Sequence, residues 1–135
     1  KDGGIELHPL TRAQGPILAF SGTPSSPVMR LVAGPRGTVV AGFANGLFGL
    51  WSLKHGGPLL VERLHGPASH LRYRKGRLRA ASELGQATEV DLSVFGLPYC
   101  RMLRAVWRAV PVVWENGLPI RRKPPANHRC RARAH

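Results

Sequence analysis

Cysteine is scarce in this chain of 135 residues, which contains only Cys100 and Cys130. Two cysteines are too few for a disulfide framework, so we expect reduced thiols and a cytoplasmic protein. Long apolar runs are also missing: no stretch of about 18 apolar residues is present, which predicts no membrane span. The first residues, Lys1 to Gly4, lack the charged-then-apolar pattern of a signal peptide.

Acidic residues are few as well, with 7 Asp and Glu against 20 Lys and Arg and a formal net charge of +13. This balance permits nucleic acid, acidic protein or anionic lipid as a partner, because each is attracted to a basic surface. Arginine heavily outnumbers lysine, and a chain rich in arginine and alanine can also reflect a genome-wide bias. The charge therefore permits these partner classes without choosing among them.

The motifs of common catalytic sites are missing. Phe20-Ser21-Gly22 does not form the G-x-S-x-G elbow, and no glycine-rich loop ends in Gly-Lys-Ser or Gly-Lys-Thr. Glu89 and Asp91 lie two residues apart on one predicted strand and have the character of surface charge. We therefore expect no enzymatic activity and no cofactor in this chain.

A zinc site is also not expected, although four residues carry the right ligand atoms: Cys100, His128, Cys130 and His135. Structural zinc sites usually show two close pairs of ligands, whereas only His128 and Cys130 are close in this sequence. Cys100 falls in a predicted helix, where a small buried thiol packing beside Met102 is the commoner arrangement.

Glycine and proline are abundant, at 16 and 12 residues, which favours many short strands and turns. The strongest turn signal is Asn45-Gly46, around which the stretch from Val39 to Leu53 forms two apolar runs. It predicts a two-residue turn, because asparagine tolerates positive φ and glycine adopts it freely. The pattern recurs at Gly3 and, more faintly, at Gly85, which lie 43 and 39 residues from Gly46.

The repeated pattern predicts three groups of strands. The second group is complete with four strands, whereas the first contains only two and the third lacks a fourth. The predicted strands are residues 5–10 and 16–20 in the first group; 28–33, 38–43, 47–53 and 59–64 in the second; and 70–74, 77–82 and 86–92 in the third.

The spacing of apolar residues along the sequence changes after residue 95. Residues 98–110 have apolar side chains at the i, i+3, i+4 spacing of an amphipathic helix, bounded by Pro98 and Pro111. A short apolar tag, 112–114, precedes a turn at Asn116-Gly117, and the charged remainder predicts an extended basic tail. Trp107 and Trp114 are expected to pack the helix against the preceding sheets; the alternative is that they anchor a partner.

The repeat resembles the blades of WD40-like propellers, which have a period of about 40 residues and four short strands. Asp2-Gly3 and Asn45-Gly46 stand where that family commonly has Asp-Gly. Leu50-Trp51-Ser52 resembles the leucine-tryptophan-aspartate end of the third strand, with Ser52 in place of the aspartate. Asp91 keeps the aspartate in the next repeat, without the tryptophan.

The resemblance covers residues 1–95 and implies an all-β fold class: a partial WD40-like β-propeller of about two and a half four-stranded antiparallel blades. Residues 96–114 then form an amphipathic helix and apolar tag packing on the propeller, and 115–135 form the basic tail. Because propellers close as rings of typically about four to eight blades, we expect this chain to be the C-terminal portion of a larger propeller. The missing blades would lie in the same parent protein or in a companion chain, and propellers of this kind often complete the last blade with an N-terminal strand.

Two basic stretches are candidate sites for binding a partner or phosphate. Arginine guanidinium groups suit bidentate contacts with phosphate, although a solvated outer face of a blade is the commoner explanation of the first stretch. The second begins the tail and suits nucleic acid or an acidic protein, or is an ordinary soluble terminus. The candidates are Arg72, Arg74, Arg77 and Arg79 in the first stretch, and Arg121, Arg122 and Lys123 in the second.

By analogy with the family, we expect a non-catalytic protein-interaction or sensing platform within a larger multidomain protein or complex. One alternative is a small basic RNA-binding component of a ribonucleoprotein. Another is a regulatory propeller attached to an upstream enzyme or effector domain. The expected partners are the remaining blades and another protein; nucleic acid belongs to the first alternative, and no membrane partner is expected.

Overall fold

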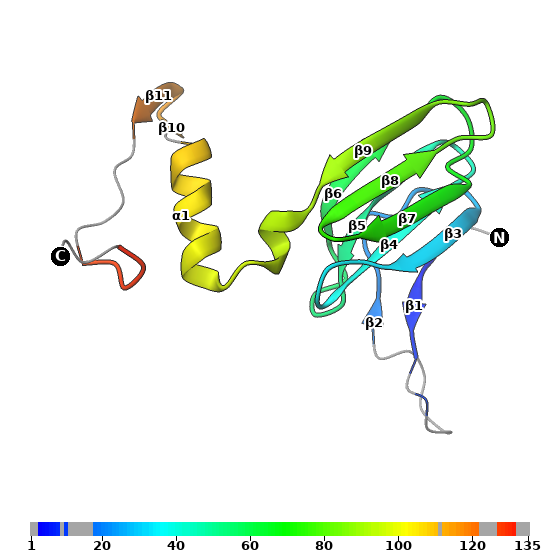
Figure 1. The fold of residues 1–135 in the computed structure, drawn as a ribbon, viewed down its shortest axis with the longest axis horizontal. Helices are drawn as coiled ribbons and strands as arrows, with labels where there is room; N and C mark the ends of the chain where they lie inside the picture. Colours follow the sequence, from blue (N-terminus) through cyan, green and yellow to red (C-terminus); the bar gives the residue numbers. More distant parts are fainter. Residues whose placement is uncertain (1–2, 9, 11–17, 111, 122–126, 132–135) are drawn as a thin grey trace. The chain divides into compact units, whose positions relative to one another are not determined.

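The computed structural model describes residues 3–8, 10, 18–110, 112–121 and 127–131. Antiparallel sheets dominate these residues, and a single α-helix is present among them, so the expectation of a mainly all-β fold is confirmed (Figure 1). The chain forms two compact units, Lys1–Leu92 and Ser93–His135, which we call the sheet unit and the C-terminal unit. No helix among the described residues is long and apolar enough to cross a membrane.

The centre of the sheet unit is a four-stranded antiparallel sheet in the order β3-β4-β5-β6. Its strands agree with the predicted ones to within one residue at each end, since short apolar runs bounded by turns mark them clearly. The strands are β3 (Val28–Ala33), β4 (Thr38–Phe43), β5 (Leu47–Ser52) and β6 (Pro58–Arg63).

A three-stranded sheet follows in the order β7-β8-β9. Its strands are β7 (His70–Arg74), β8 (Arg77–Ala81) and β9 (Ala87–Asp91). As predicted, no fourth strand of this sheet is present among the described residues; the chain turns instead into a short 3-10 helix, Ser93–Gly96.

The N-terminal strand pair is shorter than predicted. β1 (Glu6–Leu7) pairs with β2 (Leu18–Ala19), and a hydrogen bond from Phe20 N to Ile5 O at 2.9 Å continues the pairing by one step. The predicted strands 5–10 and 16–20 are therefore wrong in length within the described residues. Their remaining parts at 9, 16 and 17 lie outside those residues.

The turn at Asn45-Gly46 differs from the predicted two-residue turn. Gly46 N donates to Phe43 O at 3.0 Å, which makes a three-residue loop, and only Gly46 has positive φ, at 85°. Asn45 instead uses its side chain, whose Oδ1 accepts a hydrogen bond from Leu47 N at 3.1 Å. This is the turn-plus-bulge loop, in which glycine alone needs the left-handed conformation.

The same loop recurs where the sequence pattern was faintest. Gly85 N donates to Ser82 O at 3.1 Å, and the φ of Gly85 is 84°. A true two-residue turn joins β7 to β8, where Lys75 and Gly76 have φ values of 50° and 79°. The recurrence of the glycine turn at Gly46 and Gly85 is thus confirmed in geometry.

Apolar side chains join the three sheets of the sheet unit into a stack. One face of β3-β6 packs against the β1-β2 pair through a buried cluster: Ile5, Phe20, Ala41, Phe43 and Trp51. The opposite face packs against β7-β9, where Gly42 approaches so closely that a Cβ there would lie 3.1 Å from Leu71 Cδ1. Leu71, Leu78 and Ala80 are buried in this second layer. Burial of these apolar faces between neighbouring sheets removes them from water and so stabilises the folded unit.

In the C-terminal unit, the predicted helix is present as α1 (Tyr99–Ala109). The predicted turn at Asn116-Gly117 is also present, with φ values of 52° and 77°. The apolar tag, however, is the first strand of a hairpin, β10 (Val112–Glu115), and the expected extended tail contains the second strand, β11 (Leu118–Arg121). The prediction missed β11 because Pro119 interrupts a short stretch that is exposed along its whole length.

Candidate functional site

Four arginines lie on the face of the β7-β9 sheet that points away from β3-β6. Arg72 lies opposite Arg79, and Arg74 lies opposite Arg77 in the antiparallel register. All four are exposed, whereas the side chains between them on these strands point to the buried layer. The sequence alternation thus brings the first predicted basic stretch together as one array, which we call the basic face.

The basic face holds like charges directly across from one another, an arrangement that is destabilising unless something neutralises it. Glu89 supplies part of that neutralisation from β9. Its Oε2 accepts a hydrogen bond from Arg79 Nε at 2.6 Å, and its Oε1 accepts one from Arg77 Nη1. Glu89, expected to be ordinary surface charge, is therefore the bridge between two arginines.

These contacts shift two ionisation equilibria. The hydrogen bond from Arg79, then that from Arg77, lowers the pKa of Glu89. The hydrogen bond from Glu89 raises the pKa of Arg77, and the nearby charge of Asp91 acts in the same direction. Asp91, which lies opposite Arg77 in the register, thus adds negative charge at the β9 side of the array.

The β7 side of the basic face is left with excess positive charge. Within the described part of the chain, no ion pair shorter than 4.0 Å involves Arg72 or Arg74. A groove of about 410 Å³ is lined by five basic residues: Arg72, Arg74, Lys75, Arg77 and Arg79. A larger open groove of about 810 Å³ adjoins it. Its lining adds Arg30 of β3, Ser69 and His70, but also Glu89 and the apolar Ala80, Ala81 and Ala87. The smaller groove, lined by basic residues, is the part that suits negatively charged groups.

The residues that carry the WD40-like resemblance serve the fold. Trp51 is fully buried, and its indole Nε1 donates to Ser21 O at 3.1 Å. Leu50 is fully buried as well. Ser52 Oγ accepts hydrogen bonds from Lys54 N and His55 N, at 3.2 and 3.3 Å, and so closes the turn after β5.

Asn45 and Gly46 fix the loop between β4 and β5 to its surroundings. Asn45 N donates to Ser26 Oγ at 3.0 Å, which ties the loop to the connector before β3. Leu64 N donates to Gly46 O at 2.9 Å, and a Cβ at Gly46 would lie 2.3 Å from Leu64 O. Glycine is required here by both its φ and this close approach.

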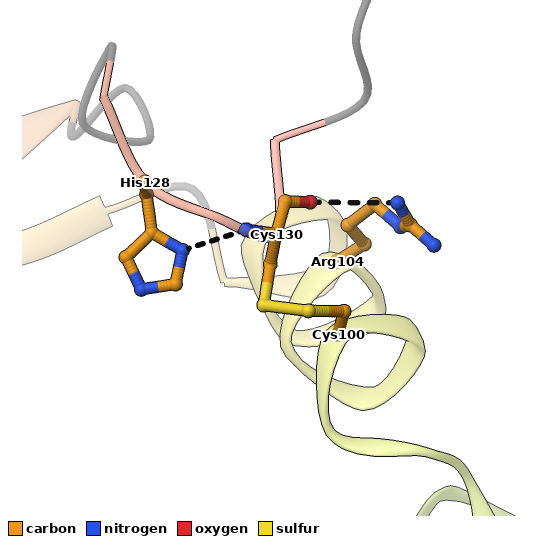
Figure 2. Close-up of a disulfide and its surroundings, with 4 residues drawn as sticks. All are labelled: Cys100, Arg104, His128 and Cys130. Carbon is orange, nitrogen blue, oxygen red and sulfur yellow. Dashed lines mark hydrogen bonds between the residues drawn. A yellow bond between two sulfur atoms is a disulfide. The ribbon is translucent and has the colours of Figure 1, made fainter.

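The C-terminal unit contains a disulfide between Cys100 and Cys130 (Figure 2). The expectation of reduced thiols is therefore wrong, because the chain returns to α1 after the β10-β11 hairpin, a contact that the 30-residue separation of the cysteines does not reveal. Both sulfurs are used in this bond, so they are not available to a zinc ion. Of the other zinc candidates, His135 lies outside the described residues.

Side-chain contacts surround the disulfide. Arg104 Nη1 donates to Cys130 O at 3.4 Å, and Cys130 N donates to His128 Nδ1 at 3.2 Å (Figure 2). The His128 ring meets the ring of Trp107 edge to face, with centroids 5.3 Å apart. This ring contact of Trp107 lies within its own unit, and the expected packing of the helix on the sheets stays a prediction.

The second predicted basic stretch is only partly described. Arg121 ends β11 and is exposed, whereas Arg122, Lys123 and the side chain of Trp114 lie outside the described residues. Arg129 belongs to the same C-terminal unit and places its guanidinium 5.1 Å from the centroid of the Tyr99 ring.

Comparison with known proteins yields likeness in fold alone. No family model and no curated protein matches the chain. The crystal structure of the computationally designed Ika4 protein is similar, with a TM-score of 0.61 and 17% identity over 68% of this chain and 56% of that chain. The computationally designed Ika8 protein is similar over 66% of this chain and 27% of its own, with a TM-score of 0.59 and 19% identity. The chain therefore spans about half of one designed protein and about a quarter of the other.

Proposed function

We propose that this chain is a non-catalytic protein-interaction or sensing platform, formed by consecutive WD40-like blades of a larger propeller. The observation that carries the proposal is the repetition of one unit in two stacked sheets. The glycine turns at Gly46 and Gly85 have the same hydrogen bond and nearly the same φ, and each joins the second and third strands of its sheet. Such sheets need neighbours on their apolar faces, as propeller blades do.

Among the described residues the β7-β9 sheet has three strands where the β3-β6 sheet has four, which supports an assembly that extends beyond this chain. Later parts of the chain cover the glycine turns at Gly3 and Gly46, where a Cβ would lie 2.2 to 2.3 Å from a carbonyl oxygen. The turn at Gly85 has no such cover, because a Cβ there would have nothing within 4 Å. Hydrogen bonds from Ser82 N to Gln86 O and from Leu92 N to Gly76 O close the two ends of the β8-β9 pair. Hydrogen-bonded and non-hydrogen-bonded pairs alternate along an antiparallel pair of strands. The backbone N–H and C=O groups of Ala87 and Glu89 therefore point away from β8, toward the free edge of β9. A strand from other parts of the assembly would pair there.

The designed proteins add support of a different kind. Nearly the same share of this chain matches both, yet that share covers 56% of one and 27% of the other. One designed protein is therefore about twice as long as the other, and both accommodate this segment equally well. A repeated structural unit would produce such a match.

Two alternative functions are also to be considered for this chain. The basic face favours an RNA-binding component of a ribonucleoprotein, since arginines in an exposed array contact phosphates well. A regulatory propeller joined to an upstream enzyme or effector remains compatible with the open edge of β9. The expected cytoplasmic location stays a prediction, and the disulfide between Cys100 and Cys130 favours an oxidising compartment instead.

Purification of the tagged native protein over a salt series tests the proposal against RNA binding. Blades held by apolar contacts and strand pairing should stay together from about 0.1 to 1 M salt and after ribonuclease treatment. Binding that depends on phosphates should weaken linearly on a log-log plot of affinity against salt. The propeller proposal would be contradicted if every companion protein dissociated with that linear dependence on salt and was also released by ribonuclease.

A further inference from the structure

We propose that the basic face is a docking surface for an extended acidic segment of a partner protein. The proposal rests on the proposed function in one respect, namely that the partner is a protein. It adds the chemistry of that partner: carboxylate side chains at alternate positions along a strand-like segment, lying over β7 and β8.

The basic face is chemically unlike the two faces that stack within the sheet unit. Those faces meet through buried apolar residues such as Phe43 and Trp51 on one side and Leu71 and Leu78 on the other. An apolar sheet laid on the basic face would remove guanidinium groups from water without giving them partners, which is strongly unfavourable. The occupant that fits this face must therefore carry negative charge.

The charge that needs neutralising is concentrated on β7. Glu89 already engages Arg77 and Arg79. Arg72 and Arg74 face only those two arginines across the register, because β7 is the edge strand of its sheet. The two residues that lack a carboxylate in the register thus lie two positions apart on the edge strand of this sheet.

The spacing of these arginines matches an extended peptide. Alternate residues of a strand lie about 6.6 Å apart along the backbone, so the Arg72 and Arg74 side chains leave β7 on the same face with that spacing. Acidic residues at alternate positions of an extended partner segment have the same period and point to the same side. Arginine and carboxylate also pair in a bidentate geometry, which makes such contacts stronger than a simple attraction of charges.

The basic face suits a peptide better than single-stranded nucleic acid. Proteins that bind single strands usually combine a basic groove with aromatic rings on which bases stack. Tyr73 lies between Arg72 and Arg74 but points to the opposite, buried side of the sheet, where it pairs with Leu78. The one ring that β7-β9 place on the basic face is that of His70, at the end of the array, where its Nδ1 lies 2.9 Å from Ser69 Oγ.

Fluorescence anisotropy with two labelled probes tests the proposal on the full chain. One probe is a twelve-residue peptide of alternating glutamate and alanine, and the other is a twelve-nucleotide oligouridylate. We expect the peptide to bind more tightly than the oligouridylate at equal salt. The double variant Arg72→Gln/Arg74→Gln should weaken peptide binding about tenfold or more, because two charge-assisted contacts are lost.

Two further variants separate the proposal from a general effect of charge or folding. Arg63→Gln removes an exposed strand arginine from the end of β6 and should leave peptide affinity within about twofold of wild type. Glu89→Gln releases Arg77 and Arg79 and should tighten peptide binding several-fold, a gain that misfolding cannot produce.

The outcomes distinguish this inference from the proposed function. Absence of peptide binding, or equal affinity of wild type and the double variant, would overturn the docking surface while leaving the salt-resistant assembly of blades untouched. Tighter binding of the oligouridylate that is lost in the double variant would also overturn it and would favour the RNA-binding alternative.

Discussion

The indole Nε1 of Trp51 donates a hydrogen bond to the backbone carbonyl oxygen of Ser21 at 3.1 Å. This contact joins β5 of the central sheet to the connector between β2 and β3, 30 residues earlier in the sequence. The same ring meets Phe43 edge to face, with centroids 5.7 Å apart. Trp51 thereby links the first two layers of the sheet unit.

Replacement of Trp51 by phenylalanine should keep most of the apolar volume but lose the hydrogen bond. We expect destabilisation on the order of 2 kcal/mol, from the unpaired carbonyl and the smaller ring together. The midpoint of urea unfolding, followed by the strand signal in circular dichroism, measures the effect. Leu84→Ala, at a side chain that is 74% exposed, is the control and should change stability by less than about 0.5 kcal/mol. An unchanged midpoint for the Trp51 variant would contradict the role assigned to the indole.

Gly46 and Gly85 form a matched pair for substitution by alanine. Both have φ near 85°, so each variant places a Cβ in the left-handed region, at a cost on the order of 1 kcal/mol. Only Gly46→Ala adds a clash, because its Cβ would lie 2.3 Å from Leu64 O, whereas Gly85 has open space. Gly46→Ala should therefore lower the free energy of unfolding by at least about twice as much as Gly85→Ala. Equal losses in chemical denaturation would show that the close approach to Leu64 is not rigid.

Reduction of the disulfide should unfold the C-terminal unit and leave the sheet unit folded. No residue of α1 is buried, so the helix has little apolar packing to stabilise it. Loss of a cross-link between residues 30 apart should remove about 3 to 4 kcal/mol from that unit. Limited trypsin digestion should then cut after Arg101, Arg104 and Arg108, before the arginines of β7 and β8 are attacked.

The double variant Cys100→Ser/Cys130→Ser should behave like the reduced protein in the same digestion. Wild type treated with the reductant and then reoxidised provides the control, because it should regain resistance. Equal protection of α1 in the oxidised and reduced forms would contradict the dependence of this unit on the disulfide.

Stability should depend on pH through Glu89. Hydrogen bonds from Arg79 and Arg77 hold the pKa of this carboxyl below its ordinary value of about 4.5. A carboxyl whose pKa is lower in the folded state stabilises the fold fully above its unfolded pKa. This contribution decreases as the pH falls below about 4.5 and is lost once the pH has passed through the folded pKa.

Glu89→Gln should make the free energy of unfolding depend less on pH below about pH 4.5. Glu62→Gln on β6 is the matched control, because it makes the same substitution at another exposed strand position. Carboxyl chemical shifts followed by NMR give the titration of Glu89 directly. A folded-state pKa at or above the ordinary value would mean that the arginine contacts do not persist in solution.

The sequence predicted the strands from β3 to β9 closely because apolar runs bounded by turns mark β4 and β5, and apolar and charged residues alternate in β7 and β8. The exposed arginines of β7 and β8 followed from the same alternation, since their neighbours Leu71 and Leu78 must face the core. The bridge by Glu89 could not be predicted in the same way, because it depends on how β8 and β9 are paired in register.

Three features depended on contacts that local patterns do not encode. The Cys100-Cys130 pairing requires the chain to fold back after the hairpin. The hairpin itself has a strand, β11, without any buried residue, so the periodicity that identifies strands is missing. Asn45 satisfies the backbone with its side chain and leaves positive φ to Gly46, an outcome that the Asn-Gly pair alone does not distinguish from a two-residue turn.

The basic face also constrains the proposed propeller. Stacking through apolar faces explains the two interfaces that the sheet unit contains, but it cannot continue over Arg72, Arg74, Arg77 and Arg79. The acidic segment proposed above would therefore take the place of a further stacked blade on this face.

The central claim is that these sheets are part of a larger assembly of similar repeats. The most direct test is the intact mass of the native polypeptide containing this sequence, under denaturing conditions, together with sequencing of its N-terminus and of any companion. We expect a mass well above 14.7 kDa, or a companion polypeptide with the same repeat of about 40 residues. A mass near 14.7 kDa without a companion would contradict the account, because these sheets would then be complete by themselves.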